Sequence, residues 1–394
     1  EKSGIWKGVL TALQDIIYFD NSATTAVYPE VLAAMHEVYI NCYGNPSSLH
    51  KLGNEADKLL QKSRETIAKT LNVDDSCIYF TSGGTESNNW AIKGVCRANK
   101  RRGNKIITTR IEHPSVLECF KYLETEGFSP VFLNVDSSGH VKTDDLRNAV
   151  DDKTILFSFI LVNNETGTIQ NAEELIREVR LKNPKTLIHV DAVQAYGKIP
   201  VNLSRLDADL MSLSSHKIHG PKGCGALYIK KNTRIIPVMH GGGQENKYRS
   251  GTENLPAIYG FAKAAEIIHE RMEENRKRIR EVKSTILNGL REEFGENFYV
   301  NSPEDAYEGI LNIAFPRVKA QVLMHHLETR NIFVSVGSAC SSRKNIQSHV
   351  LTAMNLPKEN IEGAIRLSFS AMNTVDEARA FIQAVKEIIP VIKY

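Results

Sequence analysis

Lys217 stands in the run Leu-Ser-Ser-His-Lys-Ile-His-Gly-Pro-Lys-Gly (213–223), directly after the apolar stretch 210–213. A lysine that follows a buried strand and precedes Gly220 and Pro221 is expected on a short, stiff turn. A desolvated amine has a lowered pKa and can attack an aldehyde, which is the chemistry of a Schiff-base lysine. A single lysine before a Gly-Pro turn is more often an ordinary surface residue, so this interpretation needs support from other segments.

Residues 79–89 have the composition of a turn that binds an anion. An apolar strand runs into Gly83 and Gly84, and a helix-compatible stretch follows. Glycines let backbone N–H groups approach an anion closely, and the start of a helix adds the positive end of its dipole. Thr85 adds a hydroxyl. Gly-Gly-Thr turns also occur as plain loops, but the segment lacks the lysine of a P-loop and the G-x-G-x-x-G of a dinucleotide fold. It therefore predicts a site for a single phosphate.

Asp191 ends the apolar run 187–190, and Gln194 follows it. A parallel sheet presents its ligands at the carboxyl ends of its strands. Pyridoxal phosphate needs an acidic partner on its ring nitrogen, because the protonated pyridinium is the electron sink. Asp191 suits that role and Gln194 can reach the ring oxygen, although Asp191 alone could equally be a helix N-cap. Phosphate turn, acid and lysine each stand beside a strand, and together they predict pyridoxal phosphate as the cofactor.

With these segments in view, the chain resembles the pyridoxal-phosphate-dependent cysteine desulfurases of the NifS/IscS type, within the class V aminotransferase group. The resemblance extends from Tyr18 to about residue 385. The motifs that carry it are Tyr-Phe-Asp-Asn-Ser-Ala-Thr-Thr (18–25), Gly-Asn-Pro-Ser-Ser-Leu-His (44–50), Thr-Ser-Gly-Gly-Thr-Glu-Ser (81–87), Glu-His (112–113), Val-Asn-Asn-Glu-Thr-Gly (162–167), His-Val-Asp-Ala-Val-Gln (189–194), Ser-Ser-His-Lys (214–217), Gly-Gly-Gly-Gln-Glu (241–245), Arg-Ser-Gly-Thr (249–252) and Gly-Ser-Ala-Cys-Ser-Ser (337–342).

The resemblance implies a role for several further residues. His113 would stack on the cofactor ring and serve as an acid/base, although it could also be a strand-end histidine before a proline. Arg366 would bind the substrate carboxylate bidentately, and a surface salt bridge is its other interpretation. The remaining cofactor ligands would be Asn164 and Gln194 at the ring oxygen, Gly84, Thr85, Ser214 and His216 at the phosphate, and Thr252 reaching the phosphate from a second subunit; Asn164 would also contribute to substrate binding.

Cys340 is the candidate sulfur nucleophile. It stands in a run of small residues, 335–344, which offers little to bury and should be exposed and mobile. Arg343 and Lys344 would favour the thiolate. The other five cysteines are expected to be buried or idle. The stretch 341–348 contains no glycine, so the reach of this loop, and with it the sulfur acceptor, stays open.

These residues predict a cysteine desulfurase that converts L-cysteine to L-alanine. Lys217 would hold the cofactor and later remove the substrate's Cα proton, while Asp191 stabilises the pyridinium. The Cys340 thiolate would attack the substrate sulfur and keep it as a persulfide for an acceptor protein, either an iron–sulfur scaffold or a tRNA-thiolation enzyme. A selenocysteine lyase, an aminotransferase of the same fold and a non-enzymatic scaffold that only binds a sulfur-transfer partner are the alternatives.

The fold class implied is α/β: a pyridoxal-phosphate-dependent transferase of fold type I, like aspartate aminotransferase. A mostly parallel central sheet is accompanied by a smaller α+β domain. The chain pattern agrees, because helical patterns alternate with short apolar runs. The predicted strands are 106–109, 131–133, 155–161, 187–190, 210–213 and 226–229.

The predicted domains are an N-terminal extension of unknown role (1–15), a large cofactor-binding domain (28–260), and a small domain (16–27 with 261–394) carrying the Cys340 loop. Apolar residues recur every three or four positions from Phe261 to Leu290, which predicts one long helix leading into the small domain. The resemblance adds a homodimer with active sites at the subunit interface.

Composition limits the location and partners of the protein. The 394 residues are 42% hydrophobic and 24% charged, with a net charge of +3, and no apolar stretch approaches the ~18 residues of a membrane span. The six cysteines are scattered without C-x-x-C pairs, so neither a zinc site nor a disulfide framework is indicated. We therefore expect a cytoplasmic protein with no metal, no membrane contact and no direct nucleic-acid partner.

Overall fold

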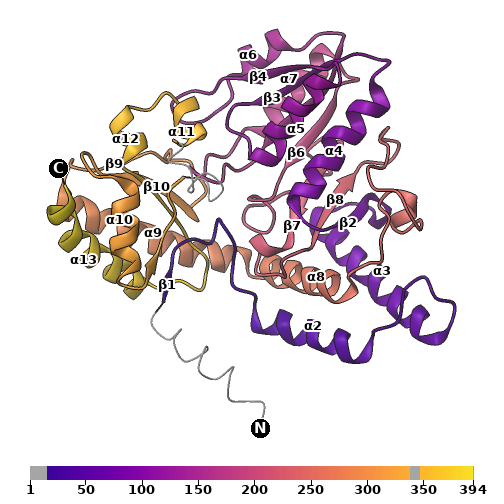
Figure 1. The fold of residues 1–394 in the computed structure, drawn as a ribbon, viewed down its shortest axis with the longest axis horizontal. Coiled ribbons are helices and arrows are strands. Elements are labelled where there is room, and N and C mark those ends of the chain that lie inside the picture. The colour runs from indigo at the N-terminus through magenta and orange to yellow at the C-terminus, as the bar shows by residue number, and fades with distance from the viewer. Residues whose placement is uncertain (1–15, 338–346, 394) are drawn as a thin grey trace. The chain divides into compact units, whose positions relative to one another are not determined.

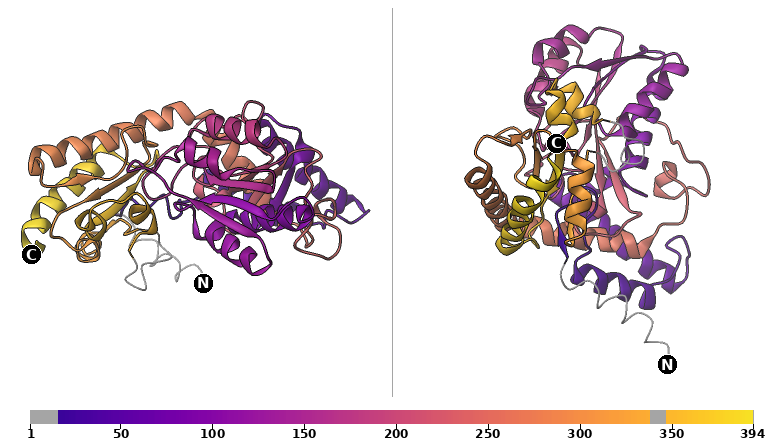
Figure 2. Two further views of the ribbon diagram at one scale, coloured as in Figure 1. Left: turned by 90° about the horizontal axis from the view of Figure 1, so that it is seen from above. Right: turned by 60° about the vertical axis from the view of Figure 1, so that its left-hand side comes forward.

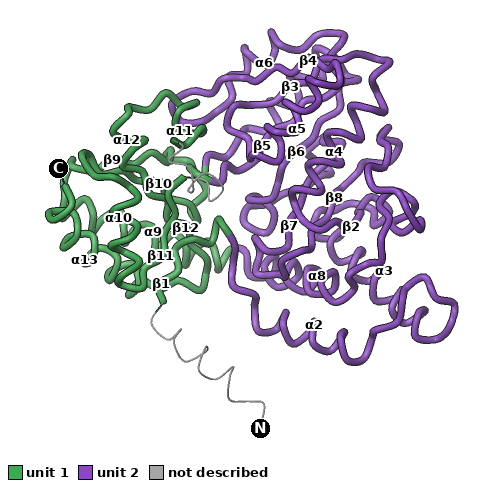
Figure 3. Tube along the Cα trace, in the orientation of Figure 1, with its two compact units in different colours: residues 1–23, 165–167, 273–394 green, residues 24–164, 168–272 purple. Residues whose placement is uncertain are grey.

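The computed structural model describes residues 16–337 and 347–393. The predicted N-terminal extension and Cys340 lie outside the described residues. The chain divides into two compact units, shown in different colours in Figure 3. Unit 1 comprises residues 1–23, 165–167 and 273–394, and unit 2 comprises residues 24–164 and 168–272.

Unit 2 is built on a seven-stranded sheet with the strand order β2-β8-β7-β6-β5-β3-β4. Its strands are β2 (Ile78–Thr81), β3 (Lys105–Thr109), β4 (Ser129–Leu133), β5 (Thr154–Ile160), β6 (Leu187–Asp191), β7 (Leu210–Ser214) and β8 (Gly225–Ile229). The neighbours from β4 to β7 pair in parallel, and only β8 is antiparallel to both of its neighbours. The predicted α/β fold with a mostly parallel sheet is confirmed. β5, β7 and β8 are buried at every position, as expected for strands covered on both faces.

Helices cover both faces of this sheet, as the two views of Figure 2 show. They are α2 (Pro29–Asn41), α3 (Lys51–Leu71), α4 (Gly84–Asn99), α5 (Pro114–Thr125), α6 (Thr143–Ala149), α7 (Ala172–Lys182) and α8 (Leu255–Glu270), with short 3-10 turns η2 (Asp75–Cys77), η3 (Ser215–Lys217) and η4 (Glu245–Lys247). α4 packs on β5 to β8, and α8 packs on α2 and α3 (Figure 1). A core of fully buried side chains such as Trp90, Ile106 and Leu156 joins α4 and α5 to the sheet.

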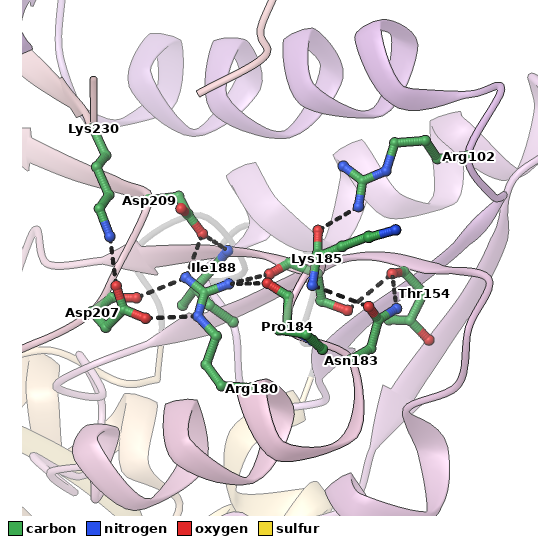
Figure 4. Close-up of polar contacts among 11 residues, drawn as sticks. Arg102, Thr154, Arg180, Asn183, Pro184, Lys185, Ile188, Asp207, Asp209 and Lys230 are labelled. Carbon is green, nitrogen blue, oxygen red and sulfur yellow. Dashed lines mark hydrogen bonds and ion pairs between the residues drawn. The ribbon is translucent and has the colours of Figure 1, made fainter. Parts of the chain in front are cut away.

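The amino ends of β6 and β7 are tied together by Arg180 of α7 (Figure 4). Its guanidinium donates to the carboxylates of Asp207 and Asp209, at 2.8 Å each. Asp209 also accepts the backbone N–H of Ile188 at 2.7 Å, and Lys230, directly after β8, donates to Asp207 at 2.5 Å. The charged groups at this edge of the sheet therefore pair with one another.

The loop between β8 and α8 is held by a buried ion pair. Arg64 of α3 makes two bonds of 2.8 Å to the carboxylate of Glu245, which also accepts the backbone N–H of Phe80 at 2.8 Å. Glu245, Asn246 and Lys247 all have positive φ, at 47°, 55° and 68°. Non-glycine residues rarely adopt this conformation, and it persists only where the surroundings enforce it. The ion pair supplies that constraint.

Unit 1 contains a three-stranded antiparallel sheet and a short parallel pair. The strands of the sheet are β9 (Tyr299–Val300), β10 (Ile310–Ala314) and β12 (Ala364–Ser368), and the pair is β1 (Ile17–Tyr18) with β11 (Ile332–Phe333). Its helices are α9 (Met272–Phe294), α10 (Ala320–Glu328), α11 (His349–Ala353), α12 (Lys358–Glu362) and α13 (Val375–Ile392). Buried residues of α9, β10, β12 and α13 form one core, which includes Ile286, Leu311, Leu367 and Phe381.

The single long helix predicted from Phe261 to Leu290 is wrong. α8 ends at Glu270, Arg271 leaves the helical conformation with φ −100° and ψ 9°, and α9 begins at Met272. The apolar stripe does continue, but its two halves serve different cores: α8 faces α2 and α3 of unit 2, whereas α9 contributes to the core of unit 1. The apolar periodicity indicates that each half of the segment is buried, but it does not show which core each half packs against.

The compact units also differ in their boundaries from the predicted domains 28–260 and 16–27 with 261–394. The boundary falls after Met272 because α8 belongs to unit 2. Residues 24–27 belong to unit 2 as well, since Thr25 bonds to the turn that carries Lys217. Residues 165–167 belong to unit 1, where the carboxylate of Glu165 accepts the hydroxyl of Ser348 at 2.5 Å.

Candidate functional site

The predicted site residues of unit 2 gather at the carboxyl edge of its sheet. Every strand except β8 runs in the same direction, so their carboxyl ends share one edge. The residues at this edge are Gly84 and Thr85 after β2, His113 after β3, Asn164 after β5, Asp191 and Gln194 at the end of β6, and Ser214, His216 and Lys217 at the end of β7.

Lys217 ends the 3-10 turn η3 that directly follows β7, and its side chain is half-buried. Thr25 clamps this turn: its N–H and its hydroxyl both donate to the carbonyl oxygen of His216, at 3.0 and 2.9 Å. The N–H of His219 donates back to the Thr25 hydroxyl at 2.8 Å, and His219 itself has a φ of +64°. The predicted short, stiff turn is confirmed.

The turn between β2 and α4 fits the phosphate of the predicted cofactor. Gly83 has a φ of +147°, and a Cβ on Gly84 would lie 2.6 Å from the Cγ2 atom of Val193, so side chains are excluded where α4 begins. The hydroxyl oxygen of Ser214 is buried beside these glycines and has no hydrogen-bond partner among the described residues. A buried hydroxyl, free N–H groups of a helix start and a glycine surface together suit a single anion.

Asp191 is 2% exposed and both of its carboxylate oxygens are oriented. Oδ1 accepts the N–H of Val193 at 3.0 Å, and Oδ2 accepts the side-chain Nδ2 of Asn88 at 2.7 Å. The aspartate thus does bond the turn that follows its strand, as a capping residue would, and its second oxygen is held independently by α4. A fixed, buried carboxylate is the group that a protonated ring nitrogen requires.

Gln194 and His216 are each oriented by a neighbour. The Nζ of Lys198 donates to Oε1 of Gln194, so Nε2 is the end of that amide that can donate to a ring oxygen. Burial, reinforced by Lys217 and Lys198, lowers the pKa of His216 to about 4, which keeps its imidazole neutral at pH 7. Its Nδ1 lies 3.2 Å from the hydroxyl of Thr24.

His113 is the N-cap of α5. Its Nδ1 accepts the backbone N–H of Ser115 at 3.1 Å and lies 2.8 Å from the Ser115 hydroxyl. The Nδ2 of Asn88 bonds the same hydroxyl at 2.9 Å. His113 and Asp191 are therefore connected through two side chains.

The contacts of the remaining predicted residues say less about their roles in the site. Asn164 is half-buried in the loop after β5, and Thr252 is exposed before α8. Arg366 is a buried residue of β12 in unit 1, where its Nη2 donates to Asp20 at 2.6 Å, so the surface salt bridge considered for it is a buried one. Cys340 is outside the described residues.

Several residues with clear contacts to the site were not predicted. They are Thr25, Asn88, Ser115 and Lys198. Asn88 offered a signal, because it lies one helical turn after Gly84 on a helix expected to start at the phosphate. Thr25, Ser115 and Lys198 each bond a predicted residue, namely His216, His113 and Gln194. Thr25 is far from the Lys217 turn in the sequence, so no sequence pattern shows that the two lie together.

Comparison with known proteins identifies the family. The family model described as "Aminotransferase class-V" matches residues 17–381. The chain belongs to this family. Among its relatives, the cysteine desulfurase IscS of Methanosarcina thermophila is 42% identical over 373 residues, which cover 95% of this chain and 92% of the relative. The resemblance to the NifS/IscS type is thereby confirmed.

Solved structures agree with this assignment. A structure described as a NifS-like protein superposes with a TM-score of 0.90 at 42% identity, covering 95% of this chain and 100% of the other. SspA in complex with cysteine superposes with a TM-score of 0.80 at 33% identity, covering 90% and 98%. Members of this family depend on pyridoxal phosphate, and the glycine turn, the Ser214 hydroxyl and the fixed Asp191 carboxylate fit that group.

The described cysteines carry no sign of a second thiol site. Cys77, Cys96, Cys119 and Cys224 are buried and Cys42 is half-buried, all as free thiols. Burial raises the pKa of Cys119 to about 11, so its thiol stays protonated at neutral pH. In the described part of the chain, no helix has the length and apolar character needed to span a membrane.

Proposed function

We propose that this protein is a cysteine desulfurase that converts L-cysteine to L-alanine and retains the sulfur on Cys340 as a persulfide. The observation that carries the proposal is the convergence of Lys217, Asp191 and the Gly83–Thr85 turn at one sheet edge, in a chain whose relatives are named cysteine desulfurases. A structural relative with bound cysteine supports the substrate.

Pyridoxal phosphate, when bound, would supply an electron sink for the pair of electrons left when the substrate's Cα–H bond breaks. Lys217 would hold it covalently, and Asp191 would keep a positive charge on its ring nitrogen. The N–H groups at the start of α4, with Thr85, Ser214 and His216, would hold its phosphate. Neutral His216 suits this role as a hydrogen-bond donor that does not titrate near pH 7.

Lys217 is the group proposed to move the proton. Its turn is fixed on both sides by Thr25 and by the 3-10 geometry of η3, so its amine has a limited region to sample. Once released from the cofactor by the substrate's amine, Lys217 would take the Cα proton and later deliver a proton to the product. Asn164 and Gln194 would orient the ring through its oxygen, with Gln194 donating from Nε2.

Sulfur transfer to Cys340 balances without an external oxidant or reductant. The Cys340 thiolate attacks the substrate's sulfur, and an S–S bond forms as the Cβ–S bond of the substrate breaks. The electron pair of that bond stays on the carbon skeleton, which takes up a proton and leaves as alanine. The sulfur remains as a persulfide on Cys340, ready for a thiol or metal-cluster acceptor.

Arg366 is proposed to bind the substrate carboxylate, with help from Asn164. Its Nη2 is already bonded to Asp20, and both side chains belong to unit 1. Asp20 would then hold the plane of the guanidinium while the other edge of that group receives the carboxylate. Asp20 belongs to the motif at residues 18–25, and the sequence alone does not indicate this role for it.

The protein is further proposed to act as a homodimer in the cytoplasm. One face of α2 and the loop after it expose large apolar side chains, among them Leu32, Tyr39, Ile40, Tyr43 and Leu49. Such a surface is typical of a subunit interface rather than of a monomer's exterior. Thr252 is exposed, as a residue that serves the phosphate of a second subunit would be. The acceptor would be an iron–sulfur scaffold protein or a tRNA-thiolation enzyme.

The test is turnover of L-cysteine in the presence of a thiol reductant. The native protein should be yellow and should produce alanine and sulfide in equal amounts, and Cys340→Ala should keep the yellow colour while losing most of the activity. Cys42→Ala, at the half-buried cysteine, is the matched control and should behave like the native protein.

Other products would indicate the alternatives. Pyruvate-like keto-acid products with no alanine would indicate an aminotransferase. Full activity of Cys340→Ala together with a strong preference for L-selenocysteine would indicate a selenocysteine lyase, since a selenolate leaves more readily. A colourless protein without turnover would indicate the scaffold.

A further inference from the structure

A continuous chain of hydrogen bonds connects Asp191 to His113 inside unit 2. Nδ2 of Asn88 bonds Oδ2 of Asp191 at 2.7 Å and the hydroxyl oxygen of Ser115 at 2.9 Å. The Ser115 hydroxyl lies 2.8 Å from Nδ1 of His113. Asn88 is 1% exposed, Asp191 2% and Ser115 9%, so bulk water does not compete for these groups.

The direction of every bond in this chain follows from its two ends. A carboxylate can only accept, so the Asp191 end requires the Asn88 amide nitrogen as donor. That nitrogen has two hydrogens, and the second points to the Ser115 oxygen. At the other end the backbone N–H of Ser115 donates to Nδ1 of His113 at 3.1 Å, so this ring nitrogen carries no proton. The Ser115 hydroxyl, already an acceptor from Asn88, then donates its own hydrogen to Nδ1.

We propose that Asn88 and Ser115 are positioning residues that hold His113 as the tautomer with its proton on Nε2, and that they tie this state to the Asp191 carboxylate. The proposal rests on the proposed function, since it deepens the roles of His113 and Asp191 in the same site. His113 then has its hydrogen-bond donor at Nε2. A proton on Nδ1 would be directed at two hydrogen-bond donors, so the ring proton resides on Nε2.

A simpler arrangement would also bond Nδ1. The backbone N–H of Ser115 is the ordinary N-cap contact of α5, and it would persist without either side chain. The two arrangements make different predictions for the tautomer of His113. Only in the proposed chain does that tautomer depend on Asn88 and on the Ser115 hydroxyl.

Four variants separate these arrangements. Ser115→Ala removes the hydroxyl and keeps the backbone N–H, while Ser115→Thr keeps both. Asn88→Asp replaces the donor by a carboxylate that faces Asp191. Asn89→Asp makes the same change one position along α4 and is the matched control. This side chain is half-buried, and its Nδ2 donates to the carbonyl oxygen of Thr85.

The decisive measurement is the tautomer of His113 in the holoprotein, by two-bond 1H–15N NMR on protein labelled with 15N-histidine, with His113→Asn used to assign the signal. The native protein should show a bare Nδ1 and a protonated Nε2. Ser115→Ala and Asn88→Asp should shift the signals toward a mixture with Nδ1 protonated, and Ser115→Thr and Asn89→Asp should match the native spectrum.

Steady-state kinetics provide the second measurement. The kcat of Ser115→Ala should fall by about tenfold, the effect of losing one hydrogen bond, with KM little changed and with recovery in Ser115→Thr. A protonated Nδ1 in the native protein, or an unchanged tautomer in both Ser115→Ala and Asn88→Asp, would overturn the proposal. The NMR result requires no turnover, so it fails or succeeds independently of the desulfurase activity.

Discussion

At the scale of single residues, the site is defined by which side chains have their orientation fixed. Asp191 has both oxygens bonded by protein donors, Gln194 has its carbonyl oxygen held by Lys198, and the turn of Lys217 is clamped by Thr25. Pre-oriented groups contribute to catalysis because no reorganisation is needed as charge develops. We therefore propose that fixed groups of unit 2 carry out the chemistry at the cofactor and that Cys340 captures the sulfur.

Replacing Asp191 by asparagine tests the electron-sink role. Asparagine keeps the size of the side chain but removes the negative charge that would hold a proton on the ring nitrogen, so kcat for alanine formation should fall on the order of 10²–10³-fold. Asp207→Asn, at the opposite edge of the sheet, changes the same group and should keep the native rate. An Asp191→Asn protein with native turnover would remove the proposed role.

The sequence allowed the residues with distinctive chemistry to be predicted, but not those that orient them. Lys217, Asp191 and the glycine turn carry recognisable types at recognisable places beside strands. The fold brings Asn88 near Asp191 and Ser115. Ser115 and Lys198 contact residues only two and four positions away, but as ordinary polar residues they carry no pattern that marks them. Arg366 is an intermediate case. The resemblance singled it out, but its bond to Asp20, 346 residues away in the chain, could not be predicted from the sequence.

At the scale of helices and strands, the sheet was predicted because each strand is a short apolar run followed by a polar turn. β7 illustrates this, since its buried residues 210–214 lead directly into the turn of Lys217. The break at Arg271 was not predicted, because the periodicity of α8 and α9 is the same on both sides of it.

The buried ion pair of Arg64 and Glu245 should dominate the stability of the loop before α8. Arg64→Leu leaves the Glu245 carboxylate buried without its cation, and we expect a loss of about 3–5 kcal/mol in the free energy of unfolding, measured as a lowered thermal midpoint. Glu55→Ala breaks an exposed pair with Lys51 and should cost less than about 1 kcal/mol. Equal effects of the two changes would show that the loop is held by something else.

His189 should make the stability of unit 2 sensitive to acid. It lies in β6 between the hydroxyls of Ser158 and Ser212, at 2.8 and 2.9 Å, and burial lowers its pKa to about 3. Below the unfolded pKa of about 6.5, the unfolded chain binds a proton that the folded chain does not. Stability therefore falls as pH drops from about 6.5 toward 3, by about 1.4 kcal/mol per pH unit.

This acid sensitivity can be checked by measuring thermal midpoints at pH 7.5 and 5.5 for the native protein and for His189→Gln. His189→Gln should be less stable than the native protein at pH 7.5, because it loses the packed imidazole ring. Its thermal midpoint should fall less than the native one when the pH is lowered to 5.5. His326→Gln, at an exposed histidine of α10, should keep the native acid response. An identical response in the His189 variant would contradict the argument.

At the scale of the whole molecule, the proposed assembly depends on the apolar face of α2. The exposed fractions of Tyr39 and Ile40 are 59% and 60%, on a helix whose opposite face packs on α8. The double change Tyr39→Asp with Ile40→Glu should convert a dimer into a monomer, measured by sedimentation at micromolar concentrations. Leu181→Glu, at an isolated exposed leucine of α7, should leave the dimer intact. A native protein that sediments as a monomer would rule out this assembly.

Mass spectrometry can show directly whether the sulfur of L-cysteine passes to Cys340. The protein is mixed with L-cysteine without reductant, alkylated, digested and analysed by mass spectrometry, with released alanine counted in the same sample. We expect one added sulfur atom on the peptide that contains Cys340, in proportion to alanine, and unmodified peptides for Cys42 and the buried cysteines. Alanine formed with no sulfur on Cys340, or sulfur found on another cysteine, would contradict it.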